Sequence, residues 1–184
     1  MNVPLGVNPP MMAPWPHPCE IPTPGQRNTG RMSEERRRPT LWQTSEMAVR
    51  SIHDVVNDAK AEIDNISPAE AKRRVEDEGA LILDIRDVRE LQREGVIPGV
   101  QHAPRGMLEF WFAPDSPYFK SGFGEDREFI LHCASGWRSA LACKALKDMG
   151  VPRVSHIETG FTGWRDDGLP LTDYEAWKAS KPTH

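Results

Sequence analysis

One stretch of the 184-residue chain combines residue types that could form a covalent intermediate. In LHCASGWRSALACK (131–144), an apolar run ends at Cys133, three small residues follow, and a helical pattern begins at Trp137 or Arg138. A thiol between a strand and a helix N-terminus lies near backbone N–H groups and the positive end of the helix dipole, and both favour an anion. Because the thiolate is the reactive form of cysteine, this position predicts that Cys133 is a nucleophile.

The residues after the thiol are suited to hold an anion. Ala134, Ser135 and Gly136 are small enough for the loop to curl with its N–H groups turned inward. Arg138 adds a fixed positive charge at the rim of this loop, and Ser139 adds another hydrogen-bond donor. A cysteine taken alone is more often an inert core residue. The combination of strand end, thiol, small-residue loop, arginine and helix favours the functional interpretation.

Composition separates a leader from the rest of the chain. Residues 1–45 hold nine of the 17 prolines and carry five Arg against three Glu, a net charge of +2, whereas the remainder has 18 basic against 24 acidic residues, or −6. The leader is predicted to be disordered, because it cannot bury enough apolar area to offset the entropy of ordering. An acidic domain does not favour nucleic acid as a partner.

The sequence shows no signal of a membrane span, a disulfide framework or a metal site. No apolar run approaches the roughly 20 residues that a membrane span needs. The cysteines, Cys19, Cys133 and Cys143, are odd in number and widely spaced, which fits neither paired disulfides nor a zinc site. The chain is therefore predicted to work in a reducing, cytoplasmic setting without a metal or cofactor.

Residues 46–66 are predicted to form one amphipathic helix, capped by Thr44 or Ser45. Its apolar positions recur in steps of three and four, at Val49, Ile52, Val56, Ala59, Ile63 and Ile66. A helix with one apolar stripe needs a partner, which is either the following domain or the same helix of a second chain in a dimer.

From residue 67 onward, helical and strand-like segments alternate. Ser67 is a predicted N-cap with Glu70 completing a capping box, and Gly79 ends this helix. Strands are predicted at 80–84, 99–103, 129–133 and 153–157, with helices at 86–94, 107–112, 137–149 and 161–167. This order is typical of an α/β domain with a parallel sheet, here covering about 67–172. The end of the chain, 173–184, is predicted to be a terminal helix, at 172–180, followed by a short tail.

Three segments resemble rhodanese-like domains. CASGWRS (133–139) resembles their active-site loop, in which the cysteine is followed by four residues, an Arg and a Ser or Thr. The stretch 81–106 is similar to their first strand with its acidic residue and Arg, and 157–171 to their closing glycine-and-tryptophan signature. The resemblance implies a single domain with a sheet of about five parallel strands flanked by helices. Val96 and Thr159 depart from the usual His and Gly, at positions expected to be structural.

The resemblance also implies roles for the residues already singled out. Cys133 would carry a persulfide, and Ala134 to Arg138, Trp137 included, would form the anion-binding loop. Asp84 and Arg86 would be a buried pair that organises the site. The implied reaction moves a sulfane sulfur from a donor such as thiosulfate to an acceptor, which is cyanide, a thiol or a protein. Such covalent catalysis follows ping-pong kinetics.

Two other functions remain open. A cysteine, loop and arginine also suit phosphatases and arsenate reductases, which bind a tetrahedral oxyanion; the resemblance implies that five intervening residues suit phosphate and four suit sulfur. Cys133 and Arg138 are separated by four residues. The second alternative is a non-catalytic partner or sulfur-carrier module, against which the intact cysteine argues.

Several further residues near the thiol have a simple structural interpretation. Arg105 could steer anions at the mouth of the pocket or form a surface salt bridge. Cys143 is predicted to pack in the core, and strand alternation should point His132 away from the face of Cys133. The 22 residues 107–128 are long for a plain connection and predict a helix followed by a glycine-containing flap. Its aromatic residues are expected to pack on the sheet, and some to line the pocket: Phe110, Trp111, Phe112, Tyr118 and Phe119.

Overall fold

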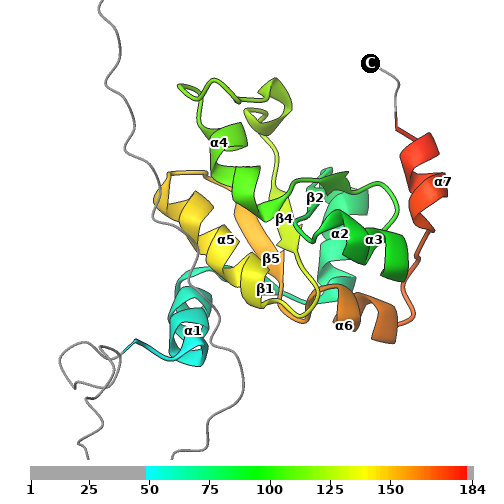
Figure 1. Cartoon of the computed structure of the whole chain (residues 1–184), viewed down its shortest axis with the longest axis horizontal. Coiled ribbons are helices and arrows are strands. Elements are labelled where there is room, and N and C mark those ends of the chain that lie inside the picture. Colours follow the sequence, from blue (N-terminus) through cyan, green and yellow to red (C-terminus); the bar gives the residue numbers. More distant parts are fainter. Residues whose placement is uncertain (1–48, 182–184) are drawn as a thin grey trace, which may run out of the picture. The chain divides into compact units, whose positions relative to one another are not determined.

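The computed structural model describes residues 49–181, and its centre is one sheet of five parallel strands (Figure 1). The spatial order is β1-β5-β4-β2-β3, and every pairing is parallel. The strands are β1 (Asp64–Ile66), β2 (Leu81–Asp84), β3 (Gln101–His102), β4 (Phe129–His132) and β5 (Val154–Ile157). The predicted α/β class with about five parallel strands is therefore confirmed.

Helices cover both faces of the sheet. They are α1 (Ile52–Glu62), α2 (Pro68–Glu78), α3 (Val88–Glu94), α4 (Leu108–Phe112), α5 (Trp137–Asp148), α6 (Gly160–Asp166) and α7 (Tyr174–Ala179). Ile82 and Ile130 lie in the core with α2 and α6, whereas Leu83 and Leu131 lie in the core with α4 and α5. Successive residues of a strand thus face opposite layers, which explains why the central strands are apolar without interruption.

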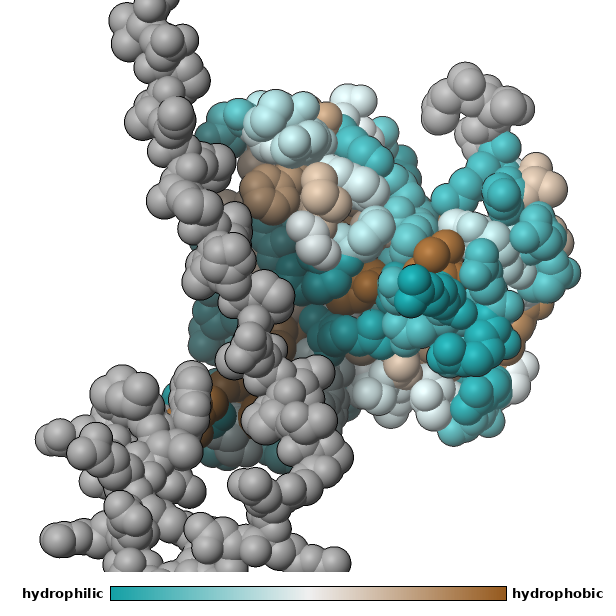
Figure 2. Space-filling model, in the orientation of Figure 1, coloured by the Kyte–Doolittle hydropathy of each residue, from teal (hydrophilic) through white to brown (hydrophobic). Residues whose placement is uncertain are grey.

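The outward surface of this fold is largely polar on the face shown in Figure 2. The surface over α3 is mainly hydrophilic there, with small hydrophobic patches beside it. Within residues 49–181, no helix is both long and apolar enough to cross a membrane.

The helix predicted at 46–66 is shorter, and its last residues form a strand. Helix α1 begins after Ser51, whose hydroxyl accepts a hydrogen bond from the N–H of His53, and it ends at Glu62. The side-chain amide of Asn65 donates to the carbonyls of Lys60 and Ile63 at 2.8 and 3.1 Å, which closes the helix end. The chain then enters β1. The predicted caps Thr44 and Ser45 lie outside the described residues.

Helix α1 packs on α5 of the same domain, which is one of the two arrangements expected from the sequence. Val56 and Ala59 are buried at 3% and 4% exposure, whereas Val49 and Ile52 are 69% and 51% exposed. The part of the apolar stripe that finds a partner is therefore its middle. Pairing of this helix between two chains stays a prediction.

The other predicted boundaries hold within a few residues, with one local difference. Ser67 caps α2 as predicted, and Gly79 ends it with φ 70°. The Glu70 carboxylate accepts hydrogen bonds from Arg73 and Arg74 instead of completing a capping box. The complete capping box belongs to α3, where Asp87 and Glu90 exchange both bonds. The leader, 1–45, and the last three residues lie outside the described part of the chain.

The packing of α1 gives a first prediction. Val56→Ala should lower the free energy of unfolding by about 1–2 kcal/mol, because it removes buried methyl groups from the contact with α5. Ile52→Ala is the matched control on the same helix and should change it by no more than about 0.5 kcal/mol. Urea denaturation of both variants measures this difference. Equal losses would show that α1 does not pack through this face.

Candidate active site

The thiol lies where the sequence predicted it, directly after β4 at the carboxyl end of the sheet. Cys133 is 1% exposed, and residues 134–136 turn the chain into α5. The Cys133 carbonyl accepts the N–H of Phe161 at 2.8 Å, and the Ala134 carbonyl accepts the N–H of Thr162 at 3.0 Å. The start of α6 thus fastens the loop that carries the thiol.

Two glycines allow this loop to lie against the turn between β5 and α6. Gly136 has φ 87°, and a Cβ there would lie 1.9 Å from the carbonyl oxygen of Glu158. Gly160 has φ 63°, and its Cβ would lie 2.6 Å from the carbonyl oxygen of Cys133. Both positions therefore require glycine for conformation and for space. Thr159, which replaces the first glycine of the usual pair, has an ordinary φ of −90°, so this position does not require the conformational freedom of glycine.

Ser139 is the side chain that reaches the sulfur. It is fully buried on the first turn of α5, and its hydroxyl lies 3.7 Å from the Sγ of Cys133. The same hydroxyl lies 3.1 Å from the Gly136 carbonyl and 3.2 Å from Nδ1 of His156. One hydroxyl proton therefore has three acceptors within reach, and the sulfur is one of them.

A chain of hydrogen bonds behind Ser139 fixes the state of His156. The Asn65 amide nitrogen donates to two carbonyls, so its oxygen is left to accept from Nε2 of His156 at 2.8 Å. This assigns the proton to Nε2 and leaves Nδ1 as an acceptor for the Ser139 hydroxyl. Burial lowers the pKa of His156 to about 4, so the ring is neutral at physiological pH.

Arg138 stands at the rim of the loop and is held by α3. Its guanidinium donates two hydrogen bonds to the Glu90 carboxylate, at 2.8 and 2.7 Å. The hydrogen bond from Arg138 is the main reason that the pKa of Glu90 lies below its usual value. The bond to Glu90 raises the pKa of Arg138, and the charge of the Cys133 sulfur adds to this effect. The predicted positive charge of Arg138 is present at the rim, but it is paired with the carboxylate of Glu90, which the sequence did not predict.

Asp84 and Arg86 form the buried pair that the sequence predicted. Both are fully buried, and Nη2 of Arg86 donates to the Asp84 carboxylate and to the Gly95 carbonyl, each at 2.8 Å. The guanidinium lies 3.8 Å above the ring centroid of Phe161. Because the Phe161 N–H holds the Cys133 carbonyl, the pair supports the thiol through this residue.

His132 completes this cluster on the face away from the thiol, as strand alternation predicted. Its Nε2 lies 3.4 Å from the Asp84 carboxylate, and its ring stacks on Phe161 with centroids 6.3 Å apart. Burial alone would raise the pKa of Asp84, but the hydrogen bonds and charge of Arg86 hold it below its usual value. Burial lowers the pKa of His132, so its ring is neutral. The cluster is therefore a charged, hydrogen-bonded support and not part of the cradle around sulfur.

A family comparison agrees with this arrangement. The family model described as "Rhodanese-like domain" matches residues 67–167, which include the thiol loop, the buried pair and α6. The chain belongs to the rhodanese-like family. Its homologues include proteins named as sulfurtransferases.

Three relatives illustrate the range of this rhodanese-like family. A sulfurtransferase of Allochromatium vinosum is 32% identical over 101 residues, 55% of this chain and 86% of that protein. A structure from Rhodopseudomonas palustris, of unknown function and described as a possible tyrosine phosphatase, is 45% identical with a TM-score of 0.64, covering 67% of this chain and 96% of that one. The polysulfide-sulfur transferase homodimer of Wolinella succinogenes is 29% identical with a TM-score of 0.53, covering 71% and 90%.

The remaining residues singled out in the sequence lie outside the cradle. Arg105 forms an ion pair with Glu109 at 2.5 Å. Of the two roles considered for Arg105, this is the surface salt bridge. Cys143 is buried, and burial raises the pKa of its thiol to about 12, so its predicted packing role is confirmed. In the described part of the chain, no group of three or more His, Cys, Asp or Glu side chains could hold a metal ion.

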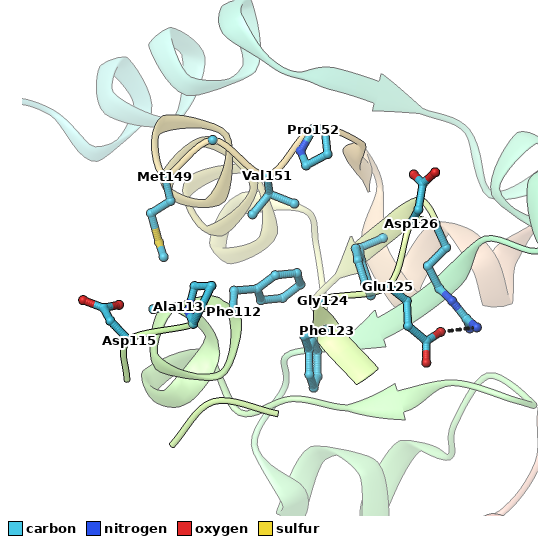
Figure 3. A pocket seen from close by; sticks show the side chains of 14 residues that line it. Phe112, Ala113, Asp115, Phe123, Gly124, Glu125, Asp126, Met149, Val151 and Pro152 are labelled. Atoms are coloured by element: carbon cyan, nitrogen blue, oxygen red, sulfur yellow. Dashed lines mark ion pairs between the residues drawn. The ribbon is translucent and has the colours of Figure 1, made fainter. Parts of the chain in front are cut away.

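A cavity of about 530 Å³ lies at the start of β4, at the opposite end of this strand from the thiol. Figure 3 shows the side chains that line it. Phe112, Phe123 and Phe129 form its apolar floor, and Phe129 begins the strand that Cys133 follows. The aromatic residues of 107–128 thus divide. Phe112 packs on the sheet as expected, whereas Phe110 and Tyr118 are 52% and 59% exposed.

The close approach of the loop gives a second prediction. Gly136→Ala should destabilise the rhodanese-like domain by more than about 3 kcal/mol, because the new Cβ meets a backbone carbonyl as well as a strained φ. Gly79→Ala is the matched control, since φ is 70° but nothing lies within 4 Å of its Cβ; it should cost about 1–2 kcal/mol. Chemical denaturation distinguishes them. Similar losses in both variants would contradict the backbone contact.

The buried histidine gives a third prediction. Its folded pKa of about 4 lies below the usual 6.5, so the unfolded chain binds the proton first as pH falls. His156 should therefore reduce stability between pH 6.5 and pH 4, by up to about 3 kcal/mol. His156→Gln keeps a donor and an acceptor but does not titrate, so its unfolding free energy should fall less over this range. Parallel slopes for variant and wild type would contradict the assignment.

Proposed function

We propose that this rhodanese-like protein is a sulfurtransferase that moves a sulfane sulfur through a persulfide on Cys133. The donor is a thiosulfate-like anion, and the acceptor is a thiol, cyanide or a protein. One observation supports this most: the buried thiol at the carboxyl end of β4, in a loop of four residues between Cys133 and Arg138. Two buried cysteines without a disulfide fit the proposed reducing, cytoplasmic setting.

The reaction has two half-reactions. The Cys133 thiolate attacks the outer sulfur of thiosulfate, an S–S bond forms, and sulfite leaves with the electron pair of the bond that breaks. The terminal sulfur of the persulfide then carries the negative charge, inside the N–H groups of residues 134–138. An acceptor nucleophile attacks this terminal sulfur, and the thiolate leaves as it was.

Ser139 and His156 have a role in both half-reactions under this proposal. While the thiol is protonated, its S–H donates to the Ser139 oxygen and the hydroxyl proton rests on neutral His156. When the sulfur is anionic, the same hydroxyl proton turns to the sulfur across 3.7 Å. The serine thus adjusts to either charge state without moving its oxygen.

Arg138 and Asp84–Arg86 act differently. Arg138 places positive charge at the entrance, and its two bonds to Glu90 fix the guanidinium there. The carboxylate offsets part of the electric field of this charge. The buried pair does not contact the sulfur. It positions the loop through the Phe161 N–H, so we assign it a positioning role.

A phosphatase is the second candidate, because the Rhodopseudomonas palustris protein, 45% identical, is described as a possible tyrosine phosphatase. A cysteine-and-arginine loop suits a tetrahedral oxyanion when the ring of N–H groups is wide enough for its three equatorial oxygens. The present loop has four residues before Arg138, which favours a single sulfur atom at its centre. The choice is therefore a matter of loop size, and both substrates can be tested on one preparation.

The fourth prediction concerns loading of the thiol. After incubation with thiosulfate, intact-mass and peptide mass spectrometry should find one added sulfur atom on Cys133, and thiosulfate:cyanide turnover should accompany it. Cys133→Ser should abolish both, whereas Cys143→Ala should retain both because that thiol is buried and remote.

Two outcomes would overturn the proposal. Turnover of p-nitrophenyl phosphate that depends on Cys133, without sulfur loading from thiosulfate or polysulfide, would assign the protein as a phosphatase. Neither loading nor phosphate turnover would favour the partner module.

A further inference from the structure

A second concave site lies along the free edge of β3, separate from the thiol. Its volume is about 470 Å³, within the usual range for small-molecule sites, and no residue of the thiol cradle lines it. Strand β3, the end of α7 and the segment after α4 supply its walls. The polar and aromatic side chains that line it are Gln101, His102, Lys120, Trp177, Ser180 and Lys181. We call it the β3 groove.

Two ammonium groups of this groove rest on tryptophan rings. Nζ of Lys120 lies 3.2 Å from the ring centroid of Trp111, and Nζ of Lys181 lies 3.7 Å from that of Trp177. A cation–π contact holds an ammonium in place but leaves its charge uncancelled. Within residues 49–181, no carboxylate lies within salt-bridge distance of either lysine. The groove therefore presents two oriented positive charges.

The two ammonium charges repel each other. Burial lowers the pKa of Lys120, and burial together with the charge of Lys120 lowers the pKa of Lys181. Both lysines stay solvent-exposed while their ammonium groups lie over tryptophan rings. An anion bound between them would relieve the repulsion of the two like charges.

The frame around the lysines is fixed in advance. The indole N–H of Trp177 donates to the Val100 carbonyl at 3.0 Å, and Nε2 of His102 lies 2.9 Å from the Arg86 carbonyl. The Ala103 N–H donates to the Asp84 carbonyl across to β2, so by strand alternation the N–H of His102 points to the free edge. A backbone donor thus faces the same side as the lysines, and little ordering remains to be done on binding.

We infer that the β3 groove binds a small anion with two adjacent negative groups, such as a diphosphate. Two lysines and a backbone N–H suit phosphate oxygens, and lysine binds phosphate as a point charge. A nucleic-acid strand is a poorer fit, because residues 46–184 carry a net charge of −6. This inference does not depend on the chemistry at Cys133.

The test is calorimetric titration of the full chain with pyrophosphate and with ADP at low salt. Saturable binding of both ligands is expected, and it should weaken as salt rises. Lys120→Gln and Lys181→Gln should each weaken binding at least about tenfold. Lys178→Gln is the matched control: it lies on α7, three residues before Lys181, removes the same charge and does not line the groove. Its affinity should stay near that of the wild type.

Perturbation of the Trp177 and Trp111 indole N–H signals in NMR spectra reports binding at this place directly. Sulfur loading of Cys133 should be unchanged in both groove variants, which separates this site from the thiol. The inference is wrong if neither ligand binds saturably, or if Lys178→Gln weakens binding as much as the groove variants do.

Discussion

The backbone of the loop after β4 lies directly against the backbone of the turn after β5, and the thiol owes its position to this contact. Gly136 faces the Glu158 carbonyl, and Gly160 faces the Cys133 carbonyl. Two N–H groups of α6 bind the carbonyls of Cys133 and Ala134 across the same contact. No side chain could replace this approach, since any Cβ would force the two backbones apart. The loop is therefore shaped by its neighbour as much as by its own residues.

The buried cluster on the other face of β4 stabilises that neighbour. Arg86 is fully buried, which is unfavourable for a charge unless every donor is used. Its partners are the carboxylates of Asp84 and Glu94, the Gly95 carbonyl and the ring of Phe161, so it joins β2, the end of α3 and α6. A change at this cluster would reach the thiol through α6 without any contact to the sulfur.

Local sequence signals predicted much of this arrangement. The position of Cys133, the four-residue loop, the glycine stop of α2 and the alternation of strands and helices each depend on neighbouring residues. Strand β1 was missed because Ile66 fits the helical spacing of α1 as well as the sheet. The Asn65–His156 contact joins residues 91 positions apart, and Arg138–Glu90 joins residues 48 apart. Such pairs are determined by how the elements pack, which spacing along one chain does not reveal.

Strand β1 also bears on what should be regarded as one domain. The family match begins at residue 67, but β1 and Asn65 come before it, and Trp177, which is 6% exposed in the core, comes after its end at 167. A fragment cut at the limits of the match would lack an edge strand, the acceptor that sets the tautomer of His156, and an aromatic core residue. The segment identified by family similarity is thus shorter than the segment that packs into one domain. The packed domain extends past both ends of the family match.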